Sequence, residues 1–132
     1  MFKKLGVSAI ASAILLIPSV ASAKWVEVSS DQVQGYSFQI DKQKITRDGD
    51  TVYYWYQTVL DTPTYEGVKK IAYNVAADCS LRNQRTLEVV YKSKTNKILG
   101  REKFVERWEQ RTSYIMTGTH EELLFSTACS AP

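Results

Sequence analysis

The sequence predicts an α+β fold, an antiparallel β-sheet meander of about five to six strands with one short C-terminal helix, joined to the sheet by a disulfide. Three observations lead to this fold class. Runs of β-branched and aromatic residues alternate with turn residues along most of the chain. A helix-capping pattern stands near the C-terminus, at Gly118–Glu122. The chain holds two cysteines, Cys79 and Cys129, an even number that can form one bridge.

Residues 1–23 have the parts of a secretory signal peptide: a basic start, an apolar run over Leu5–Val20, and small residues up to Ala23. The run is shorter than the roughly 20 residues of a spanning helix, and Pro18 interrupts it. We expect cleavage after Ala23 and a single β-rich domain over 24–132, exported to the periplasm or secreted. No cysteine stands at the cleavage site, so we expect no lipid anchor and at most peripheral contact with a membrane.

Charge and composition exclude several classes of function. The formal charge of +3 falls to +1 once Lys3 and Lys4 are removed with the signal peptide, so the domain is not a polycation. This balance and the exported location argue against nucleic acid as a partner. A single histidine and the absence of a Cys-x-x-Cys pair predict no metal site and no cofactor.

The first half of the mature chain predicts four strands, the last two of which form a hairpin. Lys24–Val28 is a short strand candidate, and Tyr36–Asp41 alternates in polarity after the polar loop Ser29–Gly35. Lys44–Arg47 then leads into an Asp-Gly turn signal, which is typical of a tight hairpin. Thr51–Leu60 is the strongest strand signal, and since both of its faces are largely apolar we place it centrally in the sheet.

The aromatic part of that central strand has two interpretations. Its residues Tyr53 to Tyr56 pack in the core, or they offer an exposed stacking surface for a sugar or a peptide. The core is the more common place for such residues, and we expect it here.

Two strands follow. Val68–Cys79 is amphipathic, and the register that buries its apolar residues also turns Cys79 towards the core. The apolar face carries Ile71, Tyr73, Val75, Ala77 and Cys79. Thr86–Ser93 is a further strand. In an oxidising compartment two cysteines most simply form one structural disulfide, here Cys79 to Cys129; a redox or metal pair is the alternative.

The C-terminal part predicts the helix and leaves one segment open. Gly100–Arg111 is helix or strand, because its apolar residues Phe104, Val105 and Trp108 have helical spacing while the local pattern is weak. Thr119 can cap a helix that runs from about 119 to 128, with Glu122 reaching back. This helix would present three apolar residues to the sheet, namely Leu123, Leu124 and Ala128.

This order of features resembles the surface-adhesin protein E family of small exported bacterial proteins. The residues that carry the resemblance are Trp25, Asp41, Trp55, Asp78-Cys79, Gly118-Thr119 and Cys129. The resemblance implies an antiparallel sheet backed by a helix, with a disulfide from Cys79 to Cys129. The adhesin that names the family lies on the cell surface and binds host matrix proteins such as vitronectin and laminin; this chain differs in lacking a lipid-attachment cysteine.

The candidate contact surface is a basic segment, which carries seven basic and three acidic residues between positions 92 and 111. Its proposed binding residues are Lys92, Lys94, Lys97, Arg101, Lys103, Arg107, Trp108 and Arg111. Such a segment attracts anionic glycans, lipid head groups or an acidic partner. The plain alternative is a solvated hairpin whose lysines prevent edge-to-edge aggregation.

These features favour an exported, non-catalytic binding module whose partner is a host extracellular-matrix protein or an anionic glycan. A periplasmic structural or accessory envelope protein is the alternative. We expect no enzyme. His120, the single histidine, falls in the first turn of an acidic helix, where we expect it to be exposed and where Thr119 serves as a cap before it serves as a nucleophile.

Overall fold

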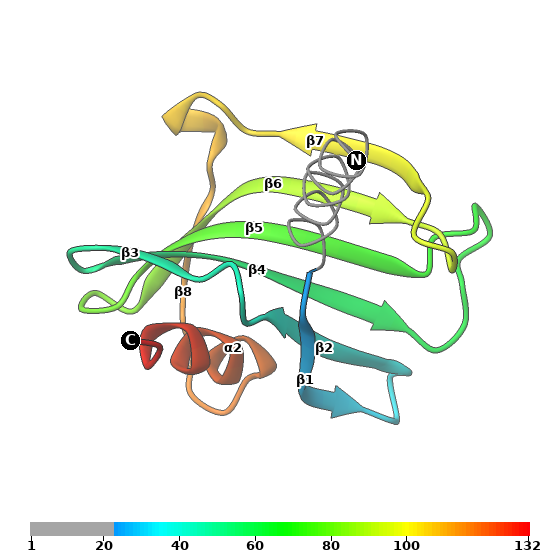
Figure 1. The fold of residues 1–132 in the computed structure, drawn as a ribbon, viewed down its shortest axis with the longest axis horizontal. Coiled ribbons are helices and arrows are strands. Elements are labelled where there is room, and N and C mark those ends of the chain that lie inside the picture. The colour runs from blue at the N-terminus through cyan, green and yellow to red at the C-terminus, as the bar shows by residue number, and fades with distance from the viewer. Residues whose placement is uncertain (1–22) are drawn as a thin grey trace, which may run out of the picture.

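The computed structural model describes residues 23–132, and the predicted signal peptide therefore lies, but for Ala23, outside the described residues. The described chain forms one antiparallel sheet and a C-terminal helix (Figure 1). In chain order its elements are β1 (Trp25–Asp31), β2 (Tyr36–Asp41), β3 (Thr46–Asp48), β4 (Thr51–Leu60), β5 (Lys70–Asp78), β6 (Asn83–Lys92), β7 (Ile98–Lys103), the 3-10 turn η2 (Arg107–Glu109), β8 (Thr112–Tyr114) and α2 (His120–Cys129). No helix within residues 23–132 has the length and apolar character needed to cross a membrane.

The strands follow one another across the sheet in the order β1-β2-β4-β5-β6-β7, so the predicted meander is confirmed. The two remaining strands, β3 and β8, add no further row to the sheet, because each lies end to end with another strand. Strand β5 occupies one edge of β4, while β2 and β3 lie one after the other along the opposite edge. Strands β7 and β8 share an edge of β6 in the same way. The eight strands of the described residues therefore form six rows, and their number exceeds the five to six strands predicted because β7 and β8 add to the predicted strands.

The central position of β4 is also confirmed, since it pairs with β2 and β3 on one edge and with β5 on the other. Its hairpin with β3 closes where Asp48 pairs with Thr51. Gly49 adopts φ +63° in this turn, a conformation that costs glycine little and other residues more. Strand β1 extends further than predicted, to Asp31, because a bulge near Glu27 lets its ladder with β2 continue.

The two faces of the sheet differ in what covers them. On the helix face, Val52, Tyr54 and Tyr56 of β4 join α2 in the core. The alternate residues of β4, such as Trp55 and Gln57, point to the opposite side, which we call the far face. The full core cluster is Ile40, Val52, Tyr54, Tyr56, Val75, Ala77, Ile115, Leu124, Phe125 and Ala128.

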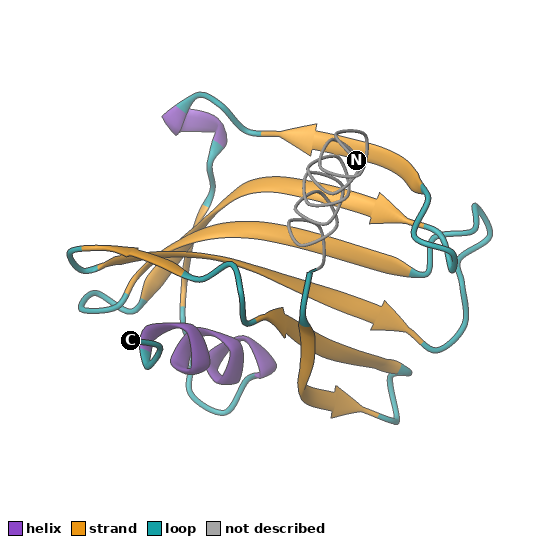
Figure 2. Cartoon of the chain, in the orientation of Figure 1, coloured by secondary structure: helices purple, strands orange, loops and turns teal. Residues whose placement is uncertain are grey.

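Helix α2 packs against β1, β2 and β4, at the lower side of the sheet in Figure 2. It begins as predicted: Thr119 is the N-cap, and its hydroxyl accepts a hydrogen bond from the Glu122 amide at 3.1 Å. The prediction that Leu123 faces the sheet is wrong, since this side chain is 48% exposed. Phe125 is buried instead, because at 100° per residue positions 124, 125 and 128 share a face and 123 does not.

The disulfide between Cys79 and Cys129 is confirmed, with a Cα–Cα distance of 5.9 Å. It joins the residue after β5 to the last residue of α2. The helix is thereby held at both ends, by its cap and core contacts at one end and by a covalent bond at the other.

Residues 100–111 contain both of the structures that the sequence left open. Strand β7 runs to Lys103, and the 3-10 turn η2 follows at Arg107–Glu109. Phe104 is half-buried, whereas Trp108 is 83% exposed. The helical spacing of these apolar residues therefore does not reflect a helix face.

We predict that Thr119→Ala lowers the free energy of unfolding by about 1 kcal/mol, because the first turn of α2 then loses the acceptor for the Glu122 amide. Thr117→Ala is the matched control, since Thr117 is an exposed residue just before the helix. Urea denaturation of both variants checks this, and equal midpoints would contradict a role for the cap.

Candidate functional site

A pocket on the far face combines aromatic and basic side chains, and we call it the Trp25 pocket. Trp25 of β1 pairs with Asp41 of β2, while Trp55 comes from β4. Ala72 of β5, only 2% exposed, lines the hollow with a small side chain. Among the lining residues are Trp25, Asp41, Lys44, Trp55, Lys92 and Arg101. The volume of about 210 Å³ is below that of most small-molecule sites, so we expect the pocket to take one group of a larger ligand.

Lys92 is the central cation of the Trp25 pocket. Its Nζ lies 5.1 Å from the centre of the Trp25 ring, within the range of a cation–π contact. Burial lowers the pKa of Lys92, and the charge of Lys70, its partner across the strands, lowers it further. An anionic group entering the pocket would offset both effects, since it stabilises the charged form of Lys92.

Two other cations near the Trp25 pocket have partners. Arg101 Nε lies 3.1 Å from Glu88 Oε2, and Lys70 Nζ donates to Asn96 Oδ1 at 2.7 Å. These contacts hold the two side chains beside Lys92. Lys44 also lines the pocket and adds a second ammonium group to its rim.

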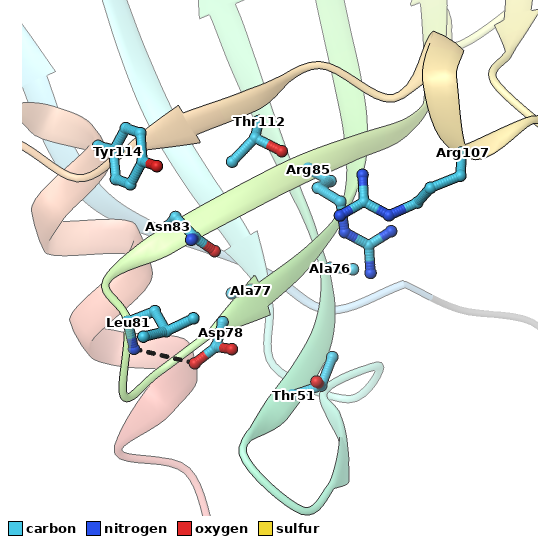
Figure 3. Close-up of a pocket in the computed structure, with 10 residues that line it drawn as sticks. All are labelled: Thr51, Ala76, Ala77, Asp78, Leu81, Asn83, Arg85, Arg107, Thr112 and Tyr114. Atoms are coloured by element: carbon cyan, nitrogen blue, oxygen red, sulfur yellow. Dashed lines mark hydrogen bonds between the residues drawn. The ribbon is translucent and has the colours of Figure 1, made fainter.

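A second pocket on the far face contains two arginines, and we call it the Arg85 pocket (Figure 3). Arg85 of β6 and Arg107 of η2 extend towards the same end of it. Arg85 Nη1 donates to Gln110 Oε1 at 2.6 Å, which fixes its guanidinium group. Paired guanidinium groups suit carboxylate, sulfate or phosphate oxygens. The volume of this pocket is about 390 Å³.

The carboxylate of Asp78 also lines the Arg85 pocket but is engaged by its own turn. It accepts hydrogen bonds from the Leu81 amide at 2.9 Å and from the Ser80 amide at 3.0 Å. The Leu81 contact is the main cause that lowers the pKa of Asp78, followed by the hydroxyl of Ser80. The negative charge is therefore directed at backbone donors, and the arginine end of the pocket stays basic.

The two pockets lie on the same face and along the same strand. Ala72 lines the Trp25 pocket and Ala76 lines the Arg85 pocket, and both belong to β5. Four residues of a β-strand span about 13 Å. One extended anionic chain can therefore reach both pockets.

The structure does not gather the predicted basic segment into one patch. Lys92 and Arg101 line the Trp25 pocket, and Arg107 lines the Arg85 pocket. Lys94 and Lys97 are exposed in the turn between β6 and β7, and Lys103 and Trp108 are exposed beyond it. Arg111 lines a different hollow with Tyr73 and Val89, on the helix face. Binding by these residues remains a prediction.

Sequence reasoning missed several residues of the two pockets. Trp25 is recognised in the sequence only as a strand residue. Trp55 belongs to the segment for which a stacking surface is the alternative, and the period of two already separates it from the core residues Tyr54 and Tyr56. The core interpretation of the aromatic strand is confirmed for Tyr54 and Tyr56, whereas a stacking role for Tyr53 and Trp55 stays a prediction. Lys44 and Arg85 carry no local signal, because their position depends on which strands become neighbours.

His120 is half-buried, which corrects the expectation that it is exposed. Its ring stacks on Phe38 at 4.8 Å, and its Nδ1 lies 2.5 Å from Ser29 Oγ. The carboxylate of Asp31 is 3.7 Å from Nε2. These contacts join the first residue of α2 to β1 and β2, across 91 residues of sequence in the case of Ser29. Within residues 23–132, no three His, Cys, Asp or Glu side chains are grouped so that they could hold a metal ion.

Comparison with known proteins supports the family resemblance. The family model described as surface-adhesin protein E matches residues 25–130. No match was found among curated protein sequences. Crystal form II of Haemophilus influenzae protein E is similar in fold, with a TM-score of 0.57 at 14% identity over 84% of this chain and 90% of that chain. A structure of protein E from non-typeable Haemophilus influenzae gives a TM-score of 0.53 at 12% identity, covering 83% and 74%.

Proposed function

Because the chain belongs to the surface-adhesin protein E family, we propose that it is an exported, non-catalytic binding module that holds an extended anionic glycan along the far face of its sheet. The Trp25 pocket takes one anionic group of the glycan, with Lys92 as the cation. The Arg85 pocket takes a second group through Arg85 and Arg107. The glycan is free, or it is carried by a host matrix protein.

One observation carries this proposal: two basic pockets lie on one face, about 13 Å apart along β5. Trp25 and Trp55 add flat apolar surfaces on which a sugar ring can stack. Two anionic side chains near the pockets are engaged elsewhere, Glu88 by Arg101 and Asp78 by its turn. A third, Asp41, lines the Trp25 pocket, is 1% exposed and accepts hydrogen bonds from the amides of Lys24 and Gln43. A polyanion on this face therefore meets cations first.

The test is binding of the exported protein to immobilised heparin across a salt series. We expect affinity to fall steeply with salt, because surface charges are screened within about 10 Å at 0.1 M. Lys92→Glu and Arg107→Glu should each weaken binding about tenfold, which corresponds to about 1.4 kcal/mol.

Arg111→Glu is the matched control for Arg107→Glu. Both side chains are exposed and lie in the same segment, and both changes alter the net charge equally. Arg111 lines the hollow on the helix face, so its reversal should weaken binding much less. Equal losses of heparin affinity in the two variants would show that binding depends only on net charge. That result would contradict a site on the far face. Binding of host matrix proteins but not of heparin would show that the partner is a protein and would contradict the glycan as ligand.

A further inference from the structure

We infer that Asp41 is the acceptor for a new N-terminal ammonium group, formed at Lys24 when the Ala23–Lys24 peptide bond is cleaved. Hydrolysis of this bond by a signal peptidase consumes one water molecule. It leaves a carboxylate on Ala23, and it leaves an amino group on Lys24 that takes up a proton. The amide of Lys24, a neutral donor before cleavage, thereby becomes a charged one.

The nitrogen of Lys24 is already in place for this contact. It donates to Asp41 Oδ1 at 3.2 Å. The carbonyl oxygen of Lys24 accepts from the Lys42 amide at 3.1 Å, and the next residue, Trp25, pairs with Asp41 in the ladder. The ladder between β1 and β2 therefore holds the nitrogen, and its position does not require the residues that precede it.

Asp41 is an unusual carboxylate because it is only 1% exposed. Its hydrogen bonds among the described residues come from two backbone donors, the amides of Lys24 and Gln43. No cationic side chain lies within ion-pair distance of it in the described part of the chain. A buried carboxylate is expensive to desolvate unless a charge compensates it, and an N-terminal ammonium at the position of the Lys24 nitrogen supplies that charge.

The other charged groups around this position are cations. Lys44 follows β2, Lys92 comes from β6 and Arg101 from β7, and all three line the Trp25 pocket with Asp41. These three cations disfavour the charged form of the α-amino group at Lys24, whereas Asp41 favours it. Asp41 accepts directly from the Lys24 nitrogen at 3.2 Å, so we expect the folded protein to raise the pKa of the α-amino group above its unfolded value of about 7.7–8.0.

The sign of the pH effect follows from this direction. A group whose pKa is higher in the folded state contributes its full stabilisation below its unfolded pKa. That contribution disappears as the pH rises through the folded pKa. Stabilisation by the α-ammonium group should therefore be present at pH 7 and absent at pH 10.5.

The experiment is a double-mutant cycle on the protein as it is exported. One change is Asp41→Asn, which keeps the shape of the side chain and removes its charge. The other is a glycine inserted between Ala23 and Lys24, which moves the amino group one residue away and leaves an ordinary amide at Lys24. N-terminal sequencing first identifies the mature end of each protein.

At pH 7 we expect Asp41→Asn to change the unfolding equilibrium constant at least fivefold more in the protein that begins at Lys24 than in the glycine-extended protein. This difference should vanish at pH 10.5. If Asp41→Asn fails to fold, the two proteins that keep Asp41, with and without the inserted glycine, are compared instead. The quantity measured is the pKa of the α-amino group, by NMR after reductive methylation, and it should be higher in the protein that begins at Lys24. A natural N-terminus other than Lys24 would overturn the inference. Equal effects of Asp41→Asn in both backgrounds, or equal α-amino pKa values, would do the same.

Discussion

Loss of the disulfide between Cys79 and Cys129 is expected to reduce the free energy of unfolding by about 4 kcal/mol. The bond closes a loop with a sequence separation of 50, and in the chain-entropy model a loop of this length restricts the unfolded chain by that amount. For a domain of this size, the melting temperature should fall by roughly 15 °C or more. The effect is large because the bridge fixes the end of α2, whose contacts supply part of the core.

The measurement is thermal unfolding of the exported protein with and without a reductant, together with the variant Cys79→Ala/Cys129→Ala. Reduction and double substitution should lower the melting temperature by similar amounts. The reductant should have no effect on the double variant, which serves as its control. A melting temperature that reduction leaves unchanged would contradict a stabilising role for the bridge.

The second large effect is expected for Leu124→Ala, which should cost about 2–5 kcal/mol of unfolding free energy. Leu124 is 1% exposed and lies in the core between α2 and the sheet. Its truncation removes apolar contacts and leaves a cavity that the helix, held at its end by the disulfide, cannot fill by a free shift towards the sheet.

Leu123→Ala is the matched control, because it makes the same change one position earlier on the same helix. Leu123 is 48% exposed, so its truncation should cost less than about 1 kcal/mol. Urea denaturation of both variants gives the comparison. Similar losses at the two positions would contradict the orientation of α2 that buries Leu124 and exposes Leu123.

The local signals in the sequence were sufficient for most of the fold. Alternation and turn chemistry located the central strand β4 and its hairpin at Gly49, and the capping box located the start of α2. These features depend on neighbours in sequence, which is why they can be predicted from it. The disulfide followed from composition and compartment, with the inward register of Cys79 in support.

The errors arose where several directions of packing were available. Leu123 and Phe125 are both apolar, and only the docking of α2 on the sheet decides which of them is buried. His120 is drawn onto Phe38 by the same docking. A pattern of apolar residues cannot separate such alternatives in a helix of ten residues with apolar side chains on more than one side.

The candidate site was predictable only in part for a related reason. Charge counting along the chain selected a continuous basic segment, but the sheet distributes its members between two faces and several turns. Lys92 and Arg107 reach the far face, whereas Arg111 lies on the helix face. Arg85 joins Arg107 from a different strand, and Trp25 joins Lys92 across the sheet. Only the order of the strands brings these residues together.

The most direct test of the proposed function uses the three tryptophans as reporters, since their indole N–H signals can be followed by NMR. Trp25 and Trp55 line the Trp25 pocket, while Trp108 is exposed on η2. On titration with a heparin-derived oligosaccharide at low salt, we predict saturable shifts of the Trp25 and Trp55 signals that disappear in Lys92→Glu. Binding that leaves both of these signals in place would show that the glycan lies elsewhere, and would contradict a binding site on the far face.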